Sequence, residues 1–368
     1  MHNSQNNIFD FATKELSQDA FLCWIMNWIN YPESDLFSLA CEFFVLLGVK
    51  DFIKEQNVTI KQQVNKADIV VALHSQKIII VIEDKVYSTE HDDQIKQYTE
   101  YFKDINNQIQ MENNSSEPYE VRSVYFKTGY FYDTDKNVVA DTIVDGDEFL
   151  NLISGEKYQH KSEILDEYVD HLKDVLGYYK KYGNYLEKEN GRYYISTETI
   201  AQHNFMRSIF PEESTWDKES GLFMVETGSS SGRPYAEVTI AKNLKFENYD
   251  KTNYLFWRVD TNSGGPYISL RLYDWYDKKD EIIKKTHNKL YDYCMNISKN
   301  VFAELKETIS LSWDDVQDGN NGNYYEASLF TIKLIEYLEK WDSKGNQLIN
   351  DINAITNKIV NAISDNGE

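Results

Sequence analysis

Two short apolar segments, each with charged residues at one end, are separated by only two residues. The first segment spans residues 68–74 and begins with Asp68, and the second spans 77–85 and ends in Glu83-Asp84-Lys85. Their Ile and Val content predicts two antiparallel strands joined by a tight turn. Ionised side chains beside such strands lose hydration, which is unfavourable unless another charge compensates. A divalent cation is the simplest compensation for acidic groups in this position.

The spacing of these residues predicts that they share one site. An antiparallel hairpin brings the start of its first strand beside the end of its second, so the carboxylates of Asp68 and Glu83 come together. Carboxylate oxygens at that spacing suit Mg²⁺ or Mn²⁺. Lys85 follows Glu83 on the same strand face, where its ammonium group can position a water molecule and offset phosphate charge. Asp84 points the other way, but its backbone carbonyl is placed to serve as a further ligand.

The residues around the hairpin alternate between helical and strand patterns. Apolar residues at helical spacing predict two helices before it, and the pattern changes to the period of a strand shortly before Asp68. The predicted elements are helices at about 11–30 and 34–47, strands at 57–64, 68–74 and 77–85, a helix at about 87–102 and a strand at 119–127. Their order is α-α-β-β-β-α-β, which predicts an α/β domain.

The chain of 368 residues is too long for a single compact core, so we expect two domains. A long charged helix at about 161–182 and the polar segment 183–191 place the boundary between domains 1–188 and 189–368. The pattern of the second part predicts an antiparallel sheet with helices, an α+β arrangement. Its predicted strands lie near 222–227, 235–241, 253–260 and 267–275, and its predicted helices at roughly 280–309, 326–341 and 345–364.

Asp68 followed by Glu83-Asp84-Lys85, within this order of elements, resembles the PD-(D/E)xK phosphodiesterase superfamily. The resemblance covers about residues 10–130 and implies a restriction-endonuclease-like core, with a C-terminal α+β accessory domain of unknown role. Three other (D/E)xK sequences end at Lys279, Lys306 and Lys344, but none of them ends an apolar strand. The residue before Asp68 is Ala67, where the family name shows proline, a position at which the family is permissive.

The resemblance also implies roles for residues outside the hairpin. Members often take a metal ligand from an acidic residue of the first helix, and Glu15 is the matching candidate. Some branches carry a Gln-x-x-x-Tyr element on the helix after the (D/E)xK strand, and Gln94 and Tyr98 match it. These two residues are therefore expected to contact the substrate or to support the site.

The function that this resemblance implies is hydrolysis of phosphodiester bonds by a Mg²⁺- or Mn²⁺-dependent nuclease, with DNA favoured over RNA as substrate. Asp68, Glu83 and Lys85 are the expected catalytic residues, and Glu15 and Asp84 are expected to complete the metal site. Similar proteins occur in bacterial defence against phage. A 5'-phosphate product is implied as well.

Other interpretations of the same residues stay open. Glu83 and Lys85 can form a plain ion pair on one strand face, and Gln94 and Tyr98 can belong to an ordinary amphipathic helix. The chain has 60 acidic and 38 basic residues and a net charge of -22, which repels polyanions. This charge favours a nuclease-like scaffold that cuts little or nothing and binds a protein or nucleotide. A third possibility is an enzyme that is silent until a ligand or a homo-oligomer completes a basic channel.

The three cysteines, Cys23, Cys41 and Cys294, form no CxxC pair, so the sequence predicts neither a disulfide framework nor a zinc site. The sequence begins without the charged and apolar segments of a signal peptide, and it has no long apolar run. We therefore expect a cytoplasmic protein without a membrane partner.

Overall fold

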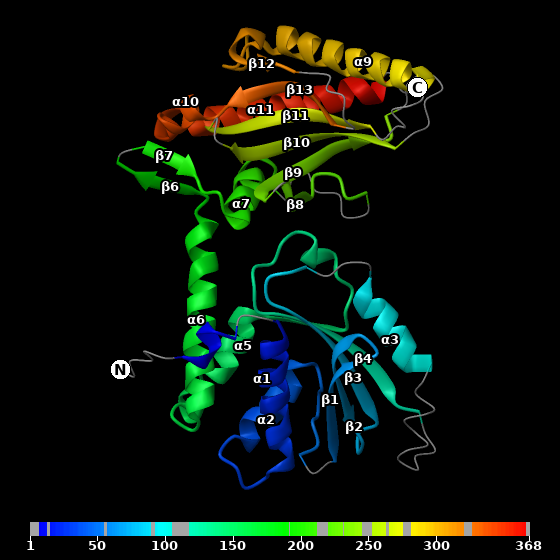
Figure 1. Cartoon of the computed structure of the whole chain (residues 1–368), viewed down its shortest axis with the longest axis vertical. Coiled ribbons are helices and arrows are strands. Elements are labelled where there is room, and N and C mark those ends of the chain that lie inside the picture. Colours follow the sequence, from blue (N-terminus) through cyan, green and yellow to red (C-terminus); the bar gives the residue numbers. More distant parts are fainter. Residues whose placement is uncertain are drawn as a thin grey trace. The chain divides into compact units, whose positions relative to one another are not determined.

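A computed structural model of the chain describes residues 7–12, 15–54, 57–89, 93–104, 118–190, 192–211, 220–230, 232–244, 252–262, 265–274, 281–319 and 326–365. The chain divides into two compact units, Met1–Lys181 and Tyr182–Glu368 (Figure 1). The boundary predicted from the sequence lies slightly later, after residue 188. Each unit mixes helices with a sheet, so the mixed α/β class is confirmed.

The first unit contains one five-stranded sheet with helices on both faces. Its main elements are α1 (Glu15–Asn27), α2 (Phe37–Leu46), β1 (Val58–Val64), β2 (Ala67–Leu73), β3 (Ile78–Lys85), α3 (Gln94–Asp104), β4 (Glu120–Lys127), β5 (Thr142–Asp145), α5 (Gly146–Ile153) and α6 (Glu163–Gly183). The helices and strands predicted before residue 128 are all present in this order. β5 and α5 were not foreseen.

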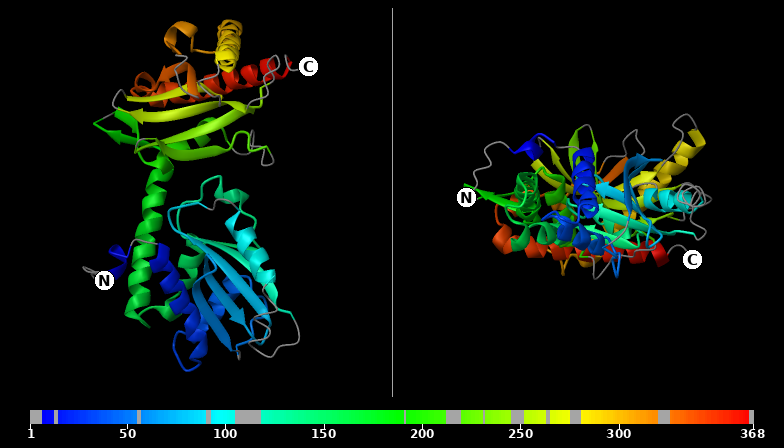
Figure 2. Two further views of the ribbon diagram at one scale, coloured as in Figure 1. Left: turned by 45° about the vertical axis from the view of Figure 1, so that its right-hand side comes forward. Right: turned by 90° about the horizontal axis from the view of Figure 1, so that it is seen from below.

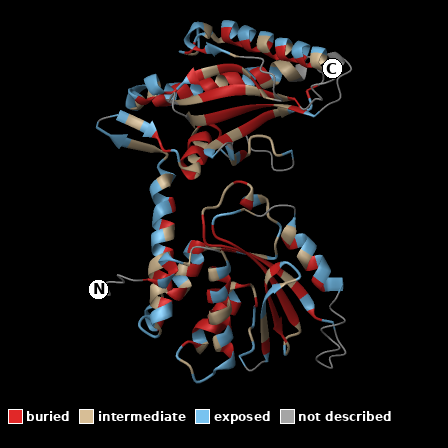
Figure 3. Ribbon diagram, in the orientation of Figure 1, coloured by how far each residue is buried: buried red, intermediate tan, exposed pale blue. Residues whose placement is uncertain are grey.

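The strands lie in the order β1-β2-β3-β4-β5. β1, β2 and β3 form an antiparallel meander, whereas β3–β4 and β4–β5 are parallel pairs. A parallel pair needs a crossover connection, and α3 lies in the one between β3 and β4. Every residue of β3 is buried, as expected for a strand covered on both faces (Figure 3).

The alternation of side chains along β3 separates the two faces of the sheet. Ile79 and Val81 pack with Phe102 of α3 in one apolar cluster. Side chains at even positions of β3 point to the opposite face. Helix α1 contacts the strand on that face, and its ribbon can be followed in Figure 2. Glu83 and Lys85 therefore lie on the α3 face, and Asp84 lies on the α1 face.

The second unit is built on a six-stranded antiparallel sheet in the order β12-β13-β11-β10-β9-β8. A separate hairpin of β6 and β7 precedes it. The elements are β6 (Leu186–Glu189), β7 (Arg192–Ile195), α7 (Thr199–Ile209), β8 (Val225–Ser230), β9 (Arg233–Lys242), β10 (Asn253–Asn262), β11 (Gly265–Asp274), α9 (Glu281–Leu305), β12 (Gln317–Asp318), β13 (Glu326–Lys333), α10 (Ile335–Leu338) and α11 (Trp341–Asp365).

The helix predicted at 326–341 is wrong over its first half, because residues 326–333 form strand β13. The pairing of β13 with β11 shifts between Leu270 and Arg271, which leaves Leu329 as an extra residue on β13. Such a bulge breaks the strict alternation of a strand. Ala327, Leu329, Phe330 and Ile332 are all buried as a result, and this spacing resembles a helix.

One face of the second sheet carries a group of charged side chains around Glu237 of β9. Arg258 of the neighbouring β10 contacts this carboxylate at 3.9 Å, Glu226 comes from β8 on the other side, and Arg271 and Glu326 come from β11 and β13. Burial and the charges of Glu226 and Glu326 raise the pKa of Glu237 from 4.5 to about 7. The charges of Arg258 and Arg271 act in the opposite direction but do not outweigh them. The folded state therefore holds this proton more tightly than the unfolded state does.

This pKa predicts a pH-dependent loss of stability in the second unit. Between pH 4.5 and about 7 the folded state binds more protons than the unfolded state, so the contribution of Glu237 to stability falls as pH rises. Glu237→Gln should raise the melting temperature at pH 8 and change it little at pH 4.5. Thermal unfolding of both proteins at the two pH values measures the effect. An equal shift at both would contradict it.

Candidate active site

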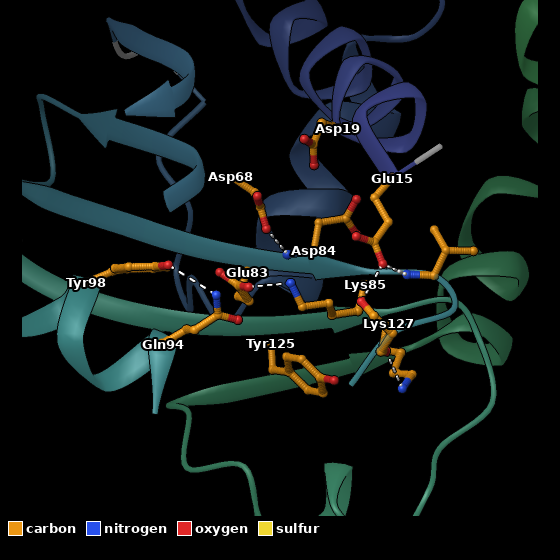
Figure 4. A network of polar contacts seen from close by, with 12 residues as sticks. Glu15, Asp19, Asp68, Glu83, Asp84, Lys85, Gln94, Tyr98, Tyr125 and Lys127 are labelled. Carbon is orange, nitrogen blue, oxygen red and sulfur yellow. Dashed lines mark hydrogen bonds and ion pairs between the residues drawn. The ribbon is translucent and has the colours of Figure 1, made fainter. Parts of the chain in front are cut away.

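The register of β2 and β3 places Asp68 beside the end of β3. The last paired residues are Ile69 and Ile82, so Asp68 and Glu83 occupy the next opposed positions. The Asp68 Oδ2 atom accepts a hydrogen bond of 2.9 Å from the backbone N–H of Asp84 (Figure 4). The carboxylate of Asp68 is thus fixed against the backbone of the neighbouring strand.

Glu83 and Lys85 form a buried ion pair on the α3 face of the sheet. The Lys85 Nζ atom donates to Glu83 Oε1 at 2.5 Å, and the side chains are 9% and 3% exposed. Burial alone would lower the pKa of Lys85, but the hydrogen bond and charge of Glu83, with the charges of Asp68 and Glu15, raise it. The lysine is therefore an ammonium ion at neutral pH.

Glu15 reaches the same end of β3 from the first turn of α1. Its Oε1 atom accepts hydrogen bonds from the Ser88 hydroxyl at 2.7 Å and from the Val86 N–H at 3.3 Å. Burial opposes its ionisation, but these two bonds and the charge of Lys85 lower the pKa of Glu15. The structure thus brings Glu15, Asp68 and Glu83 around Lys85.

The side chain of Asp84 lies on the opposite face, against α1. Its Oδ1 atom accepts a hydrogen bond of 2.6 Å from the Gln18 amide. Burial and the charge of Asp19 raise the pKa of Asp84, and burial is also the main cause that raises the pKa of Asp19 to about 6. A hydrogen bond between the two side chains also raises the pKa of Asp84 and lowers that of Asp19, so Asp84 holds the proton that the pair shares.

Gln63 links the two groups of acids and was not anticipated from the sequence. Its amide donates to Asp68 Oδ1 at 3.2 Å and to Asp19 Oδ2 at 3.3 Å. Its backbone φ of 51° lies in the left-handed region, which few residues other than glycine adopt. With this backbone conformation at the strand end, the Gln63 amide lies against the carboxylates. The alternation of a strand does not predict such a conformation, so this contact could not be predicted from the sequence.

Gln94 and Tyr98 lie one turn apart at the start of α3. The Gln94 amide donates to the Tyr98 hydroxyl at 3.3 Å. Burial and the negative charge of Glu83 raise the pKa of Tyr98, so its hydroxyl stays protonated near the acids. The start of α3 therefore borders the ion pair of Glu83 and Lys85.

The described residues contain no group of three or more His, Cys, Asp or Glu side chains already arranged to hold a metal ion. One oxygen of Glu83 is occupied by Lys85, and one oxygen of Asp68 by a backbone N–H. The donors are nevertheless of the right type for a cation. Three carboxylates, those of Glu15, Asp68 and Glu83, surround Lys85, and those of Asp19 and Asp84 form a second acidic pair on the α1 face of the same strand end. Such an excess of oxygen ligands suits Mg²⁺ or Mn²⁺ better than a soft metal.

Comparison with known proteins adds no relative. No family model, curated protein or solved structure matches the chain. The helices of the described residues include none with the length and apolar character of a membrane span.

Proposed function

We propose that the first unit is a metal-dependent nuclease of the PD-(D/E)xK kind, with a restriction-endonuclease-like core, that hydrolyses phosphodiester bonds. DNA is favoured over RNA as the substrate. The observation that carries the proposal is the convergence of Glu15, Asp68, Glu83 and Lys85 at one end of β2 and β3. A structural ion pair alone would not require the two further carboxylates.

The residues that would hold Mg²⁺ or Mn²⁺ are Asp68, Glu83 and Glu15, with the backbone carbonyl of Asp84 as a fourth donor. The bound cation would lower the pKa of water and neutralise charge on the phosphate. The carboxylate oxygens of these three residues fit this role because they carry more negative charge than Lys85 balances. Gln63 and the Asp84 N–H fix the Asp68 carboxylate, so little rearrangement of that ligand is needed.

Lys85 is suited to stabilise negative charge and not to remove a proton. Its raised pKa keeps it protonated at neutral pH, so it is a poor general base. A fixed ammonium group in a buried site stabilises charge that develops on the phosphate during hydrolysis. The partner carboxylate of Glu83 holds the ammonium group in place until substrate binds.

Incubation of the purified chain with plasmid DNA, linear DNA and RNA, in Mg²⁺, Mn²⁺ or EDTA, tests the proposal. We expect cleavage of DNA that requires the metal and leaves 5'-phosphate ends. Calorimetric titration with Mn²⁺ should show binding without any substrate. A chain that neither binds Mn²⁺ nor cuts any of these substrates would overturn the proposal.

A second candidate function is a nuclease-like scaffold that binds a protein or nucleotide and does not cut. The net charge of -22 and the occupied oxygen of Glu83 favour it. Phosphate contacts strengthen as salt falls. DNA binding measured at low salt with Mn²⁺ present therefore separates the two functions, because the scaffold should show none.

We expect Gln94→Leu to weaken substrate binding more than it slows the chemical step. An amide that contacts a phosphate is worth about 1.5–3 kcal/mol, so KM should rise roughly tenfold or more while kcat changes little. Steady-state kinetics with a short duplex give both constants. Gln97→Leu, on the same helix, is the matched control. Equal constants for wild type and Gln94→Leu would remove Gln94 from the substrate site.

A further inference from the structure

Lys127 is a fully buried lysine at the end of β4, directly beside Lys85 of β3. The parallel register pairs these two residues, and the Lys127 side chain is 0% exposed. Burying a lysine is unfavourable unless it is paired, and apolar residues of similar volume often serve stability as well or better. Its presence next to the candidate active site therefore calls for an explanation other than core packing.

Asp135 compensates the buried charge of Lys127. The Lys127 Nζ atom donates to Asp135 Oδ2 at 2.6 Å, and both side chains are 0% exposed. Asp135 also accepts hydrogen bonds from the Tyr125 hydroxyl and from the Tyr132 N–H, at 2.5 and 2.8 Å. Burial lowers the pKa of Lys127, and the charge of Asp135 opposes this. The carboxylate is thus held by three donors.

One further hydrogen bond leads from this ion pair to the candidate active site. Lys127 Nζ donates at 2.8 Å to the backbone carbonyl of Ser88, in the turn that follows β3. The hydroxyl of the same Ser88 donates to Glu15 at 2.7 Å, and the Val86 N–H donates at 3.3 Å. Lys127 therefore fixes the turn whose donors orient the Glu15 carboxylate (Figure 4).

The backbone after β4 presses against the same turn. A Cβ atom at Gly129 would lie 1.6 Å from the carbonyl oxygen of Val86, so a larger residue would push the two segments apart. The Thr128 N–H donates to the Lys85 carbonyl at 3.2 Å. The 86–88 turn is thus held by backbone contacts as well as by Lys127.

We propose that Lys127, supported by Asp135, is a positioning residue that sets the Glu15 carboxylate for divalent-cation binding through Ser88. The inference rests on the proposed function, because it assigns Glu15 to the same metal site. Lys127 acts through Ser88 and does not itself contact the cation. Loss of outer groups that orient metal ligands typically weakens metal binding by about 10–100-fold.

Two variants test the two ends of this connection. Ser88→Ala removes the hydroxyl that donates to Glu15 and leaves the buried ion pair intact. Lys127→Met/Asp135→Asn removes both charges together, so that neither is left buried alone. Ser75→Ala, at the turn between β2 and β3, replaces another exposed serine and is the control.

Calorimetric titration of each full-length protein with Mn²⁺ alone gives the readout, with thermal unfolding measured in parallel. We expect both variants to bind Mn²⁺ about tenfold or more weakly than wild type. Ser88→Ala should keep the wild-type melting temperature, and Ser75→Ala should bind as wild type does. If Lys127 had a purely structural role, Lys127→Met/Asp135→Asn would change the melting temperature but bind Mn²⁺ as wild type does.

The outcomes separate this inference from the proposed function. If wild type binds Mn²⁺ and Ser88→Ala binds it equally well, the positioning role is overturned while the metal site stands. If wild type binds no Mn²⁺, the metal site itself is overturned, and the positioning role falls with it.

Discussion

Replacement of Asp68 by asparagine should lower metal-dependent cleavage roughly a thousandfold, the factor that about 4 kcal/mol of lost transition-state stabilisation produces. The substitution removes one negative charge from the proposed metal site. The amide oxygen of asparagine can still accept the hydrogen bond from the Asp84 N–H, so the connection between β2 and β3 remains. We therefore expect thermal unfolding to change little. The rate is measured on linear DNA at saturating Mn²⁺.

A matched control separates charge at the site from charge in general. Asp104 is exposed at the end of α3, about 15 Å along the helix axis from Gln94. Asp104→Asn changes the net charge by the same amount and should cut at the wild-type rate. Full activity of Asp68→Asn would remove Asp68 from the site. An equal loss in both variants would point to net charge as the cause.

The hairpin could be predicted because the residues that define it are close together in the sequence. Apolar β-branched residues mark β2 and β3, and the turn between them fixes which residues face each other. That register alone places Asp68 opposite Glu83. The position of Lys85 on the same face as Glu83 follows from the alternation of a strand. Whether these residues bind a cation and cut nucleic acid stays a prediction.

The remaining parts of the site depend on contacts between distant segments. The sequence indicates that Asp19 shares a helical face with Glu15, but its approach to Asp84 depends on how α1 packs on the sheet. Lys127 ends a strand in the sequence, and nothing nearby marks it as the partner of the 86–88 turn. Such contacts depend on how distant segments pack against one another, and the local sequence pattern does not specify that packing.

The errors in the predicted fold have a similar origin. β5 is four residues long with only Val144 buried, which is too short to show a strand period. In β13 the bulge at Leu329 imitates helical spacing. Both strands are defined by their partners in the sheet, and their own sequences give little sign of them.

The second large effect is expected in the second unit, where His287→Leu should destabilise the fold by about 3 kcal/mol. His287 Nδ1 lies 2.6 Å from Asp274 Oδ2, and the two side chains are 1% and 0% exposed. Removing the imidazole deprives a buried carboxylate of this partner, which costs more than the pair itself contributes. Urea unfolding followed by circular dichroism measures the loss.

A double-mutant cycle distinguishes this mechanism from simple loss of packing. Asp274→Leu alone should also be strongly destabilising, because it leaves the imidazole of His287 buried without its carboxylate. The double variant removes both polar groups and replaces them with apolar volume. It should therefore be more stable than the sum of the two single effects implies, by about 1–3 kcal/mol of coupling energy. If the two losses are additive, Asp274 on β11 and His287 on α9 stabilise the second unit independently of each other.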